Sequence, residues 1–504
     1  MAEARLRRFE ERAWTNWHRS VTTPILARYE VHNADAAPSM AGMCDTTRVI
    51  QGLIGEAQAA GVRLRVAGSK WSFSEVAAAT DSWALDTPPI NWSFRVSPAS
   101  LSPGYSGDPE SLFLVQAGLS IAELNKLLET SFGRSLRTTG ASNGQTIPGA
   151  MGTGTHGSAL DLGAIQCQVV GLQLIPGATR NLWIERATYP VASDTFVGRL
   201  EAELVRDDEL FEAALVNLGG LGVVHAVMIE TAPRFLLEAS QFRRPYDATL
   251  RQAMDTADFS GIELPGGAER PYFLHVVRNP YDEVDAFVKV MYARECPADY
   301  APDYRLSGEY GPGYDVPGLL GRLLDVAAPF TPAILAPLMS GQLKTFSDKR
   351  GTWGETFDYT TPRADTIGTG LAIPVAKTSQ ALDIVQAAFR EGGPAPLIYA
   401  CRFVAKSPGL LAFTRFDPTC VIDLDGLRSE RALRLMEDIR QRFEAAGIPY
   451  AQHWGKLHGL TAERVRQSYG AGVDDWLAAR GRLMPSEADR HTFSSAFLEG
   501  LGLA

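Results

Sequence analysis

Residues 138–158 limit the possible structures of this chain more than any other segment, because they are unusually rich in glycine, serine and threonine. Glycine has no Cβ, so a backbone of this composition can approach a ligand closely. Successive N–H groups and hydroxyls can then surround phosphate oxygens. The composition therefore predicts a loop that binds a nucleotide cofactor. The alternative is a glycine-rich loop that only turns the chain.

Within this segment, Gly152–Gly157 has the G-x-G-x-x-G spacing of a dinucleotide-binding fingerprint. That fingerprint requires a strand before it, a helix after it and an acidic residue about 20 positions later. The residues before it form no apolar strand run, and those after it show no helical periodicity. Beyond Asp161 the next acid is Glu185, which lies too far along the chain. These departures disfavour a Rossmann-type site.

The length and composition exclude several classes of protein. A chain of 504 residues exceeds one hydrophobic core, so two or three domains are expected. The net charge of −10, without a basic run, argues against binding of nucleic acid or of an anionic membrane. We expect no membrane span, since no apolar run reaches 18 residues, and no signal peptide. Five cysteines without C-x-x-C spacing indicate reduced thiols and a cytoplasmic protein without a zinc site.

Hydrophobic periodicity and capping signals predict alternating helices and strands. A helix over 46–60 precedes a short strand over 62–66, in which Val62, Leu64 and Val66 alternate with arginines. A capping box over 120–123 opens another helix. Further helices are expected over 207–216 and 428–446, and further strands over 112–116, 169–175, 223–229, 397–404 and 419–424.

Three segments together resemble a known family. Residues 149–157, Gly-Ala-Met-Gly-Thr-Gly-Thr-His-Gly, resemble the second flavin-binding loop of the VAO/PCMH flavoproteins, in the branch of the alditol oxidases and sugar-1,4-lactone oxidases. Residues 67–73, Ala-Gly-Ser-Lys-Trp-Ser-Phe, are similar to the first flavin loop of that family. Residues 453–456, His-Trp-Gly-Lys, match a motif near the C-terminus of the branch. The matches cover about 200 residues in the right order.

The resemblance implies an α+β fold with two domains. An FAD-binding domain of the PCMH type is expected over 1–235 and a substrate or cap domain, with a mixed or antiparallel sheet, over 236–430. The segment 431–504 is expected to return to the FAD-binding domain.

The resemblance also implies which residues bind FAD. In the family, a histidine of the first loop often bonds covalently to the flavin. Here that position is Trp71, whose indole has no imidazole nitrogen for the bond, so FAD is expected to be non-covalent. Two of these positions also have a purely structural interpretation. Trp71 could be an aromatic side chain of the core, and the glycines around Gly222 could form a turn before a core strand. The implied cofactor-binding residues are Ala67, Gly68, Ser69, Lys70, Trp71, Ser72, Phe73, Gly140, Ala141, Ser142, Thr146, Gly149, Thr153, Gly154, Thr155, His156, Gly157, Gly222, Val224 and Lys456.

Four residues are candidates for catalysis. The sugar-alcohol oxidases carry E-x-R where this chain has Ala400 and Arg402, so the arginine matches and the glutamate is missing. Arg402 is expected to orient the substrate oxygen, and Lys456 and His453 to lie near the flavin ring. The carboxylate of Asp423 interrupts an apolar strand and either replaces the lost glutamate or simply pairs with Arg402. The proton acceptor stays open between Asp423, His453 and an unidentified residue.

The expected activity is FAD-dependent oxidation of a CH–OH group in a small alcohol, polyol or sugar lactone, by hydride transfer to flavin N5. Dioxygen is the expected electron acceptor. A small residue beside the flavin, placed near Gly140, is expected to control oxygen access, unless glycine is needed there for a positive φ. The alternatives are a dehydrogenase with another acceptor and a flavin-fold protein without redox chemistry. A metal site at His453 and His458 is disfavoured by their spacing.

Overall fold

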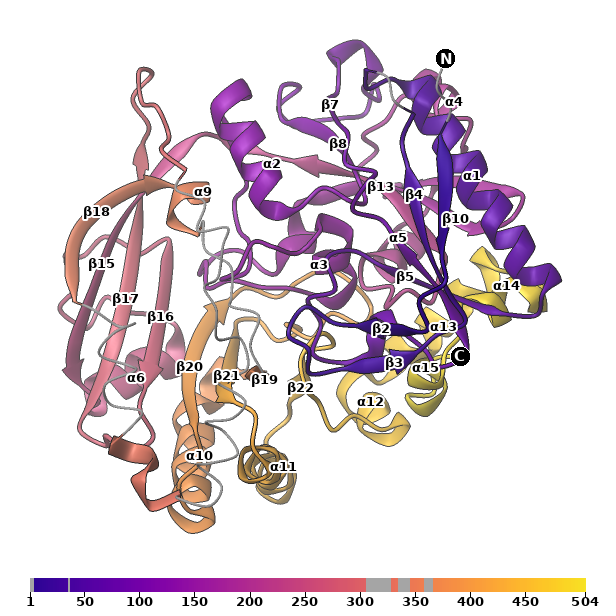
Figure 1. Ribbon diagram of the computed structural model, residues 1–504. Coiled ribbons are helices and arrows are strands. Elements are labelled where there is room, and N and C mark those ends of the chain that lie inside the picture. The colour runs from indigo at the N-terminus through magenta and orange to yellow at the C-terminus, as the bar shows by residue number, and fades with distance from the viewer. Residues whose placement is uncertain (1–3, 35–36, 305–327, 334–344, 358–365) are drawn as a thin grey trace.

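A computed structural model describes residues 4–34, 37–304, 328–333, 345–357 and 366–504. It contains helices together with mixed and antiparallel sheets, so the predicted α+β class is confirmed. Figure 1 shows two bodies of secondary structure, one built mainly from the indigo and purple elements of the N-terminal part and one from the pink and orange strands and helices that follow.

The N-terminal body contains two sheets. The first has the strand order β1-β4-β6-β5, with β4, β6 and β5 parallel. Its strands are β1 (Arg5–Phe9), β4 (Ala27–His32), β6 (Ser82–Asp86) and β5 (Arg63–Ala67). The second sheet has the order β12-β11-β10-β13-β8-β7. Its strands are β12 (Glu203–Arg206), β11 (Arg180–Glu185), β10 (Val169–Gly177), β13 (Val223–Glu230), β8 (Leu112–Gln116) and β7 (Ser93–Arg95).

Helices surround these two sheets, and two small strand pairs complete the body. The helices are α1 (Met40–Ala59), α2 (Ile121–Leu127), α3 (Ile147–Thr153), α4 (Asp194–Arg199) and α5 (Asp208–Leu215). The small pairs are β2 (Ala13–Thr15) with β3 (Thr22–Pro24) and β9 (Arg134–Ser135) with β14 (Ala232–Pro233). The predicted capping box is present, since the Glu123 N–H donates to Ser120 Oγ and the Ser120 N–H donates to Glu123 Oε2.

The second body is built on one eight-stranded antiparallel sheet, which we call the cap sheet. In spatial order its strands are β18 (Phe346–Thr352), β15 (Phe235–Pro245), β17 (Asp285–Glu295), β16 (Phe273–Arg278), β20 (Leu397–Val404), β21 (Thr419–Leu427), β19 (Thr366–Pro374) and β22 (Ala451–Gln452). The short helix α9 (Trp353–Thr356) follows β18.

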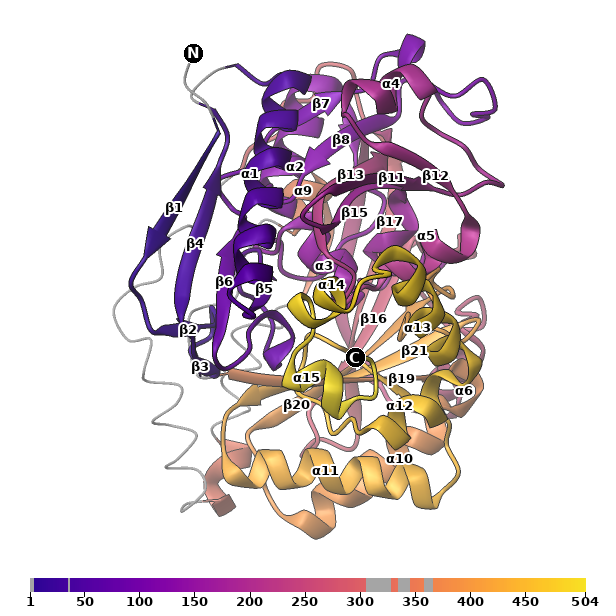
Figure 2. The same ribbon diagram turned by 90° about the vertical axis from the view of Figure 1, so that its right-hand side faces the viewer.

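Three helices cover the outer face of the cap sheet: α6 (Ala248–Thr256), α10 (Thr378–Gly392) and α11 (Glu430–Ala445). Figure 2 shows α10 and α11 lying across the end of the molecule below the strands. Apolar side chains of these helices pack on alternate residues of the strands, such as Val276 and Cys401. The other residues of those strands therefore face the N-terminal body, because strand side chains alternate between faces.

After β22 the chain leaves the cap sheet and returns to the first body. Four helices follow: α12 (Ala462–Tyr469), α13 (Ala471–Leu483), α14 (Glu487–Thr492) and α15 (Ala496–Gly500). Their buried side chains, including Trp476 and Leu498, share one core with α1, β5 and β10. Figures 1 and 2 show these yellow helices beside the indigo elements of the N-terminus.

Most predicted elements are present within a few residues. The expected helices correspond to α1, α2, α5 and α11, and the expected strands to β5, β8, β10, β13, β20 and β21. The short helix α3, inside the glycine-rich segment, was not predicted. The alternation of apolar residues and arginines in β5 does not match the burial of its side chains. Arg65 is 1% exposed, whereas Val66 is only half-buried.

Candidate active site

A cavity of about 970 Å³ lies between the inner face of the cap sheet and the loops of the N-terminal body. Its walls contain all three segments that carry the family resemblance, together with residues of β15, β16, β17 and β20. A volume of this size falls at the upper end of the range for ligand pockets. The cavity therefore has room for a large cofactor and a small substrate.

The first loop follows β5 directly and packs against the second loop. A Cβ at residue 68 would overlap the Thr146 side chain, so the close approach of the two loops requires glycine. Lys70 has a φ of 62°, a conformation that usually favours glycine. Its ammonium lies 2.7 Å from Asp86 Oδ2, which holds the loop to β6.

The first loop is also bonded to the His-Trp-Gly-Lys motif, which lies about 380 residues later in the chain. The Phe73 N–H donates to Gly455 O over 2.8 Å, and Ser74 Oγ donates to Trp454 O over 2.7 Å. The motif directly follows the edge strand β22, which pairs with β19. The cap sheet and the first loop therefore meet at this motif.

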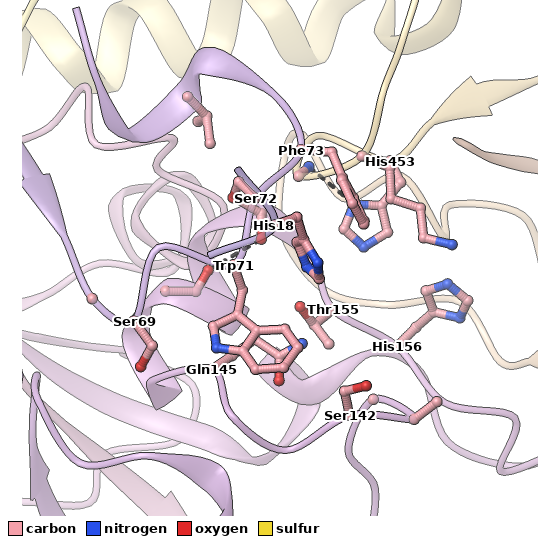
Figure 3. Close-up of a pocket in the computed structure, with 18 of the residues that line it drawn as sticks. His18, Ser69, Trp71, Ser72, Phe73, Ser142, Gln145, Thr155, His156 and His453 are labelled. Atoms are coloured by element: carbon pink, nitrogen blue, oxygen red, sulfur yellow. Dashed lines mark hydrogen bonds between the residues drawn. The ribbon is translucent and has the colours of Figure 1, made fainter. Parts of the chain in front are cut away.

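Aromatic rings surround Trp71 at one side of the cavity. The Trp71 ring stacks on Trp17 with centroids 5.2 Å apart, and His18 meets its edge at 5.4 Å. Figure 3 shows His18 between Trp71 and Phe73, with His156 and His453 farther along the same cavity. Burial lowers the pKa of His18 to about 4, and its Nδ1 has no hydrogen-bond partner.

A third segment of the cavity wall, residues 217–222, is held by Arg65. The Arg65 guanidinium donates to Leu218 O over 2.8 Å and to Gly219 O over 3.0 Å, and it also reaches Val76 O and Phe493 O. Burial lowers the pKa of Arg65 to about 10. Gly222 has a φ of 121°, which only glycine readily adopts.

The catalytic candidates form one charged cluster. Lys456 Nζ donates to Asp423 Oδ1 over 2.7 Å and to Asp425 Oδ1 over 2.9 Å, while Arg402 Nε lies 3.3 Å from Asp423 Oδ2. Burial alone would raise the pKa of Asp423, but Lys456 and Arg402 hold it well below its usual range. Burial alone would lower the pKa of Lys456, but the two carboxylates raise it. Asp423 is therefore ionised and Lys456 charged at neutral pH.

Two neutral histidines lie beside this cluster, and their hydrogen bonds imply opposite tautomers. His453 Nδ1 accepts from the Gly455 N–H over 3.0 Å, which leaves the proton of the neutral ring on Nε2. His156 Nδ1 lies 3.0 Å from Gly157 O, which can only accept, so Nδ1 carries the proton and Nε2 has a free lone pair. Burial lowers the pKa of His156 to about 4 and that of His453 well below its usual value.

Most of the predicted site residues line the cavity. Those that do not are Ala67, Gly154, Gly157 and Asp423. Gly154, at φ 75°, ends α3, and Gly157 packs against Thr139 O, so both shape the loop from behind. Asp423 is completely buried and acts on the cavity through Lys456 and Arg402.

Sequence reasoning missed other residues of the cavity wall. They are His18, Asn217, Gln241, His275, Lys289 and Asp425, among others. Asp425 had a signal, because it lies two residues after Asp423 in one strand and so shares its face. Gln241, His275 and Lys289 lie in the part of the chain where the resemblance to the family is weak. His18 and Asn217 lie outside the three matching segments, so only the folded chain brings them to the cavity.

The cavity wall fits a flavin dinucleotide. Glycine at residue 68 lets the two loops pack closely, and Gln145 Oε1 and His18 Nδ1 are buried polar atoms without partners in the protein alone. No group of three or more potential metal ligands occurs among the described residues. In that same part of the chain, no helix combines the length and apolar character needed to cross a membrane.

No protein-family model matches the chain. The L-gulono-1,4-lactone dehydrogenase of Mycobacterium tuberculosis is 25% identical over 449 residues, covering 86% of this chain and 90% of that protein. The L-gulonolactone oxidase of Bos taurus is 28% identical over 196 residues, or 39% of this chain and 37% of that protein. The D-arabinono-1,4-lactone oxidase of Debaryomyces hansenii is 25% identical over 210 residues, or 41% of this chain and 34% of that protein.

Among solved structures, a cholesterol oxidase from Brevibacterium sterolicum superposes with a TM-score of 0.72 at 14% identity, covering 99% of this chain and 97% of that one. A likeness at this identity concerns the fold. It extends through both bodies of the molecule, and the sequence likeness to the Mycobacterium tuberculosis dehydrogenase covers 86% of the chain. The chain is therefore similar in sequence to sugar-1,4-lactone oxidoreductases, and its fold is of the VAO/PCMH type.

Proposed function

We propose that this protein is an FAD-dependent oxidoreductase that oxidises a CH–OH group of a small alcohol, polyol or sugar lactone. The observation that carries the proposal is the junction of the first loop with the His-Trp-Gly-Lys motif, through the Phe73–Gly455 and Ser74–Trp454 hydrogen bonds. This junction brings Lys456, a charged group, into a cavity lined by all three flavin-type segments. The lactone oxidoreductases related to this chain support the same class of reaction.

FAD would lie along the first loop, the second loop and the 217–222 segment, with the ring system toward Lys456. When bound, FAD would supply an acceptor for hydride at N5, and its reduced form would carry negative charge at the N1–C2=O end. The ammonium of Lys456 would place a positive charge near that end of the flavin. Asp423 and Asp425 accept hydrogen bonds from this ammonium, and they keep it protonated and fixed in position. A preorganised charge of this kind acts mainly on the transition state.

His156 is the proposed proton acceptor for the substrate hydroxyl. Its Nε2 has a free lone pair and lies 4.0 Å from Asp423 Oδ2, whose negative charge would favour the imidazolium. Asp423 itself is a poor base, because Lys456 and Arg402 hold its pKa well below the usual range. His453 carries its proton on Nε2 and is suited to donate a hydrogen bond. Arg402 would orient the substrate oxygen.

The proposed electron acceptor is dioxygen. Relatives of this chain are named both as oxidases and as a dehydrogenase, so the acceptor is a property of local structure near the flavin. The position near Gly140 is the proposed control point. We further propose a cytoplasmic location, in which the five free cysteines would stay reduced.

Purified protein tests this proposal directly. A yellow sample whose absorbance near roughly 450 nm bleaches with an alcohol or lactone substrate, and recovers in air, is an oxidase. Recovery only after addition of a dye identifies a dehydrogenase. A sample that no member of a broad panel of alcohols and lactones bleaches would contradict the proposed redox function and favour a flavin-fold binding protein.

FAD is proposed to be bound without a covalent link, because Trp71 stands at the linking position of the first loop. Acid precipitation should therefore release all the flavin into the supernatant. Flavin that stays with the pellet would refute this. Mass spectrometry of its peptides would then identify the attachment residue, with His18 as the imidazole beside Trp71.

A further inference from the structure

One polar row crosses four neighbouring strands of the cap sheet. Gln241 on β15 pairs with Lys289 on β17, Lys289 pairs with His275 on β16, and His275 pairs with Arg402 on β20. Residues directly opposite one another on adjacent strands point to the same face. All four line the cavity, on the inner face of the sheet. The row therefore continues the wall from Arg402 to a part of the cavity remote from Lys456.

The cations of this wall differ in how they are neutralised. Arg402 lies against Asp423, and Lys456 is shared by Asp423 and Asp425. Lys289 has no carboxylate within ion-pair distance among the residues that the structure describes. Its ammonium lies 6.0 Å from the Phe346 ring centroid and 5.9 Å from that of Phe357, at the limit of a cation–π contact.

Desolvation and one neighbouring lysine oppose the positive charge of Lys289. Burial lowers the pKa of Lys289 to about 8, and the nearby charge of Lys349 acts in the same direction. On the other side, burial holds the pKa of His275 well below its usual value, with Lys289 and Arg402 contributing, so His275 is neutral. Lys289 is half-buried in the wall of the cavity, and a partly desolvated cation in such surroundings is costly unless an anion pairs with it.

We propose that Lys289 binds a carboxylate of the substrate, so that the preferred substrate is a hydroxy acid rather than an uncharged lactone or polyol. This inference rests on the proposed function and narrows its substrate class. The neutral His275, next in the row, would hydrogen-bond a hydroxyl between the carboxylate and the oxidised carbon. An uncharged substrate would leave the ammonium without an anion, and this difference produces the preference.

The distance along the row limits the shape of the substrate. Lys289 and Arg402 stand two strand spacings apart, or about 10 Å between backbones. The long lysine side chain shortens the distance that the ligand must span. A substrate whose oxidised carbon lies near Arg402 and His156 would therefore carry its carboxylate several bonds away, as in a sugar acid.

Binding of D-gluconate and of D-glucitol to the FAD-loaded protein tests the proposal, because the two differ in one terminal carboxylate against one CH₂OH group. Calorimetric titration without oxygen should show gluconate binding at least about tenfold more tightly, as one charge-assisted hydrogen bond provides. Lys289→Gln should reduce the ratio to within about twofold. Lys349→Gln, which removes the exposed neighbouring lysine, should keep it.

A parent protein that binds both compounds equally, or a Lys289→Gln protein that keeps the preference, would overturn the proposal. FAD content and melting temperature establish that the variant folds. If the variant does not fold, calorimetric titration of the parent protein with gluconate and glucitol at several pH values tests the role of Lys289 instead. The preference should decline above about pH 8, where Lys289 loses its proton while gluconate stays ionised; a preference unchanged to pH 10 would refute the role of Lys289.

Failure of this inference and failure of the proposed function are distinguishable. Bleaching by alcohols together with equal binding of gluconate and glucitol would refute only the carboxylate site. Preferential binding of gluconate without bleaching by any hydroxy compound would refute the redox function and leave the carboxylate site supported.

Discussion

His156 and His453 differ in chemistry although their ring centroids are only 5.8 Å apart. The difference arises from the backbone group that each Nδ1 meets, a carbonyl for His156 and an N–H for His453. Of the two rings, His156 is the one that presents a free lone pair at Nε2, and for this reason we propose it as the proton acceptor.

Replacement of His156 by glutamine should slow flavin reduction by about 10²–10⁴-fold, because glutamine keeps a hydrogen-bonding group but cannot accept the proton. Stopped-flow reduction at saturating substrate is the measurement, with FAD content as the folding check. In the parent, the rate should fall as pH drops through about 4, where His156 becomes protonated. A His156→Gln protein that is reduced at the parental rate would exclude this residue as the base.

Gly140 does not have a positive φ, so backbone conformation is not what requires glycine there. A Cβ at this position would lie 2.7 Å from Thr155 Cγ2, inside the cavity wall. Gly140→Ala should therefore slow reoxidation by air, since one methyl group fills space that oxygen needs. Rapid mixing of the reduced protein with air-saturated buffer measures this rate.

The double variant Gly140→Ala, Thr155→Ser separates oxygen access from the clash itself, because serine lacks the Cγ2 that the new methyl would meet. If oxygen access limits reoxidation, both variants should reoxidise slowly, while their rate of reduction by substrate and their FAD content stay at the parental values. Recovery of fast reoxidation in the double variant would attribute the defect to the Thr155 contact. Fast reoxidation of the single variant would remove residue 140 from oxygen control.

At the scale of elements, the cofactor side of the cavity depends on contacts between segments far apart in the chain. Strand β5 leads into the first loop, and Arg65 in the same strand holds the 217–222 segment and reaches Phe493 near the C-terminus. One buried side chain therefore aligns two segments that we propose to bind the cofactor, and it fastens the returning helices to them.

Arg65→Met should lower the free energy of unfolding by at least about 2 kcal/mol, because several buried carbonyls lose their donor. It should also weaken FAD binding, since the 217–222 segment loses its anchor. Denaturant unfolding and flavin fluorescence measure the two effects. Arg63→Met is the matched control, because Arg63 is half-buried and pairs with Glu499. This replacement should lower the free energy of unfolding by less than about 1 kcal/mol. Equal losses in both variants would contradict the anchoring role.

At the scale of the whole molecule, the cap and the N-terminal body are joined through buried polar groups. Glu129 accepts from Thr352 Oγ1 over 2.6 Å and from the Gly354 N–H over 2.9 Å. Trp353 Nε1 donates to Thr139 Oγ1 over 2.7 Å, near the start of the glycine-rich segment. These bonds position the cap sheet over the cofactor loops, so the site depends on the docking of both bodies.

Stability of the whole molecule should fall as pH drops from about 6.5 to about 4. Burial lowers the pKa of several histidines, which are His18, His156, His225, His275, His453 and His458. In this window the unfolded chain binds more protons than the folded one, and each such histidine contributes about 1.4 kcal/mol per pH unit. The stabilisation is fully present above about pH 6.5.

Denaturant midpoints at pH 7, 6 and 5, together with calorimetric proton uptake on unfolding, measure this effect. Uptake of more than one proton at pH 5 is expected. A midpoint that does not move between pH 7 and 5 would show that these histidines keep ordinary pKa values in the folded protein.

Local sequence was sufficient for much of the fold and for the cofactor side of the site. Strands such as β8 and β20, and the capping box at Ser120, follow from patterns within a few residues, because period and capping are local properties. The flavin-type loops were found for the same reason. Helix α3 was missed, since its glycine content disfavours a helix and only packing against neighbouring elements stabilises it.

The sequence by itself therefore determined the secondary structure, the family likeness and the loops that approach the cofactor, because these depend on short-range patterns. Tertiary structure alone decided the burial of Arg65, the place of His18 beside Trp71 and the row from Gln241 to Arg402. Each of these brings together residues from separate strands or loops. Burial and strand register set their charge and exposure, and both are defined only once distant segments have packed.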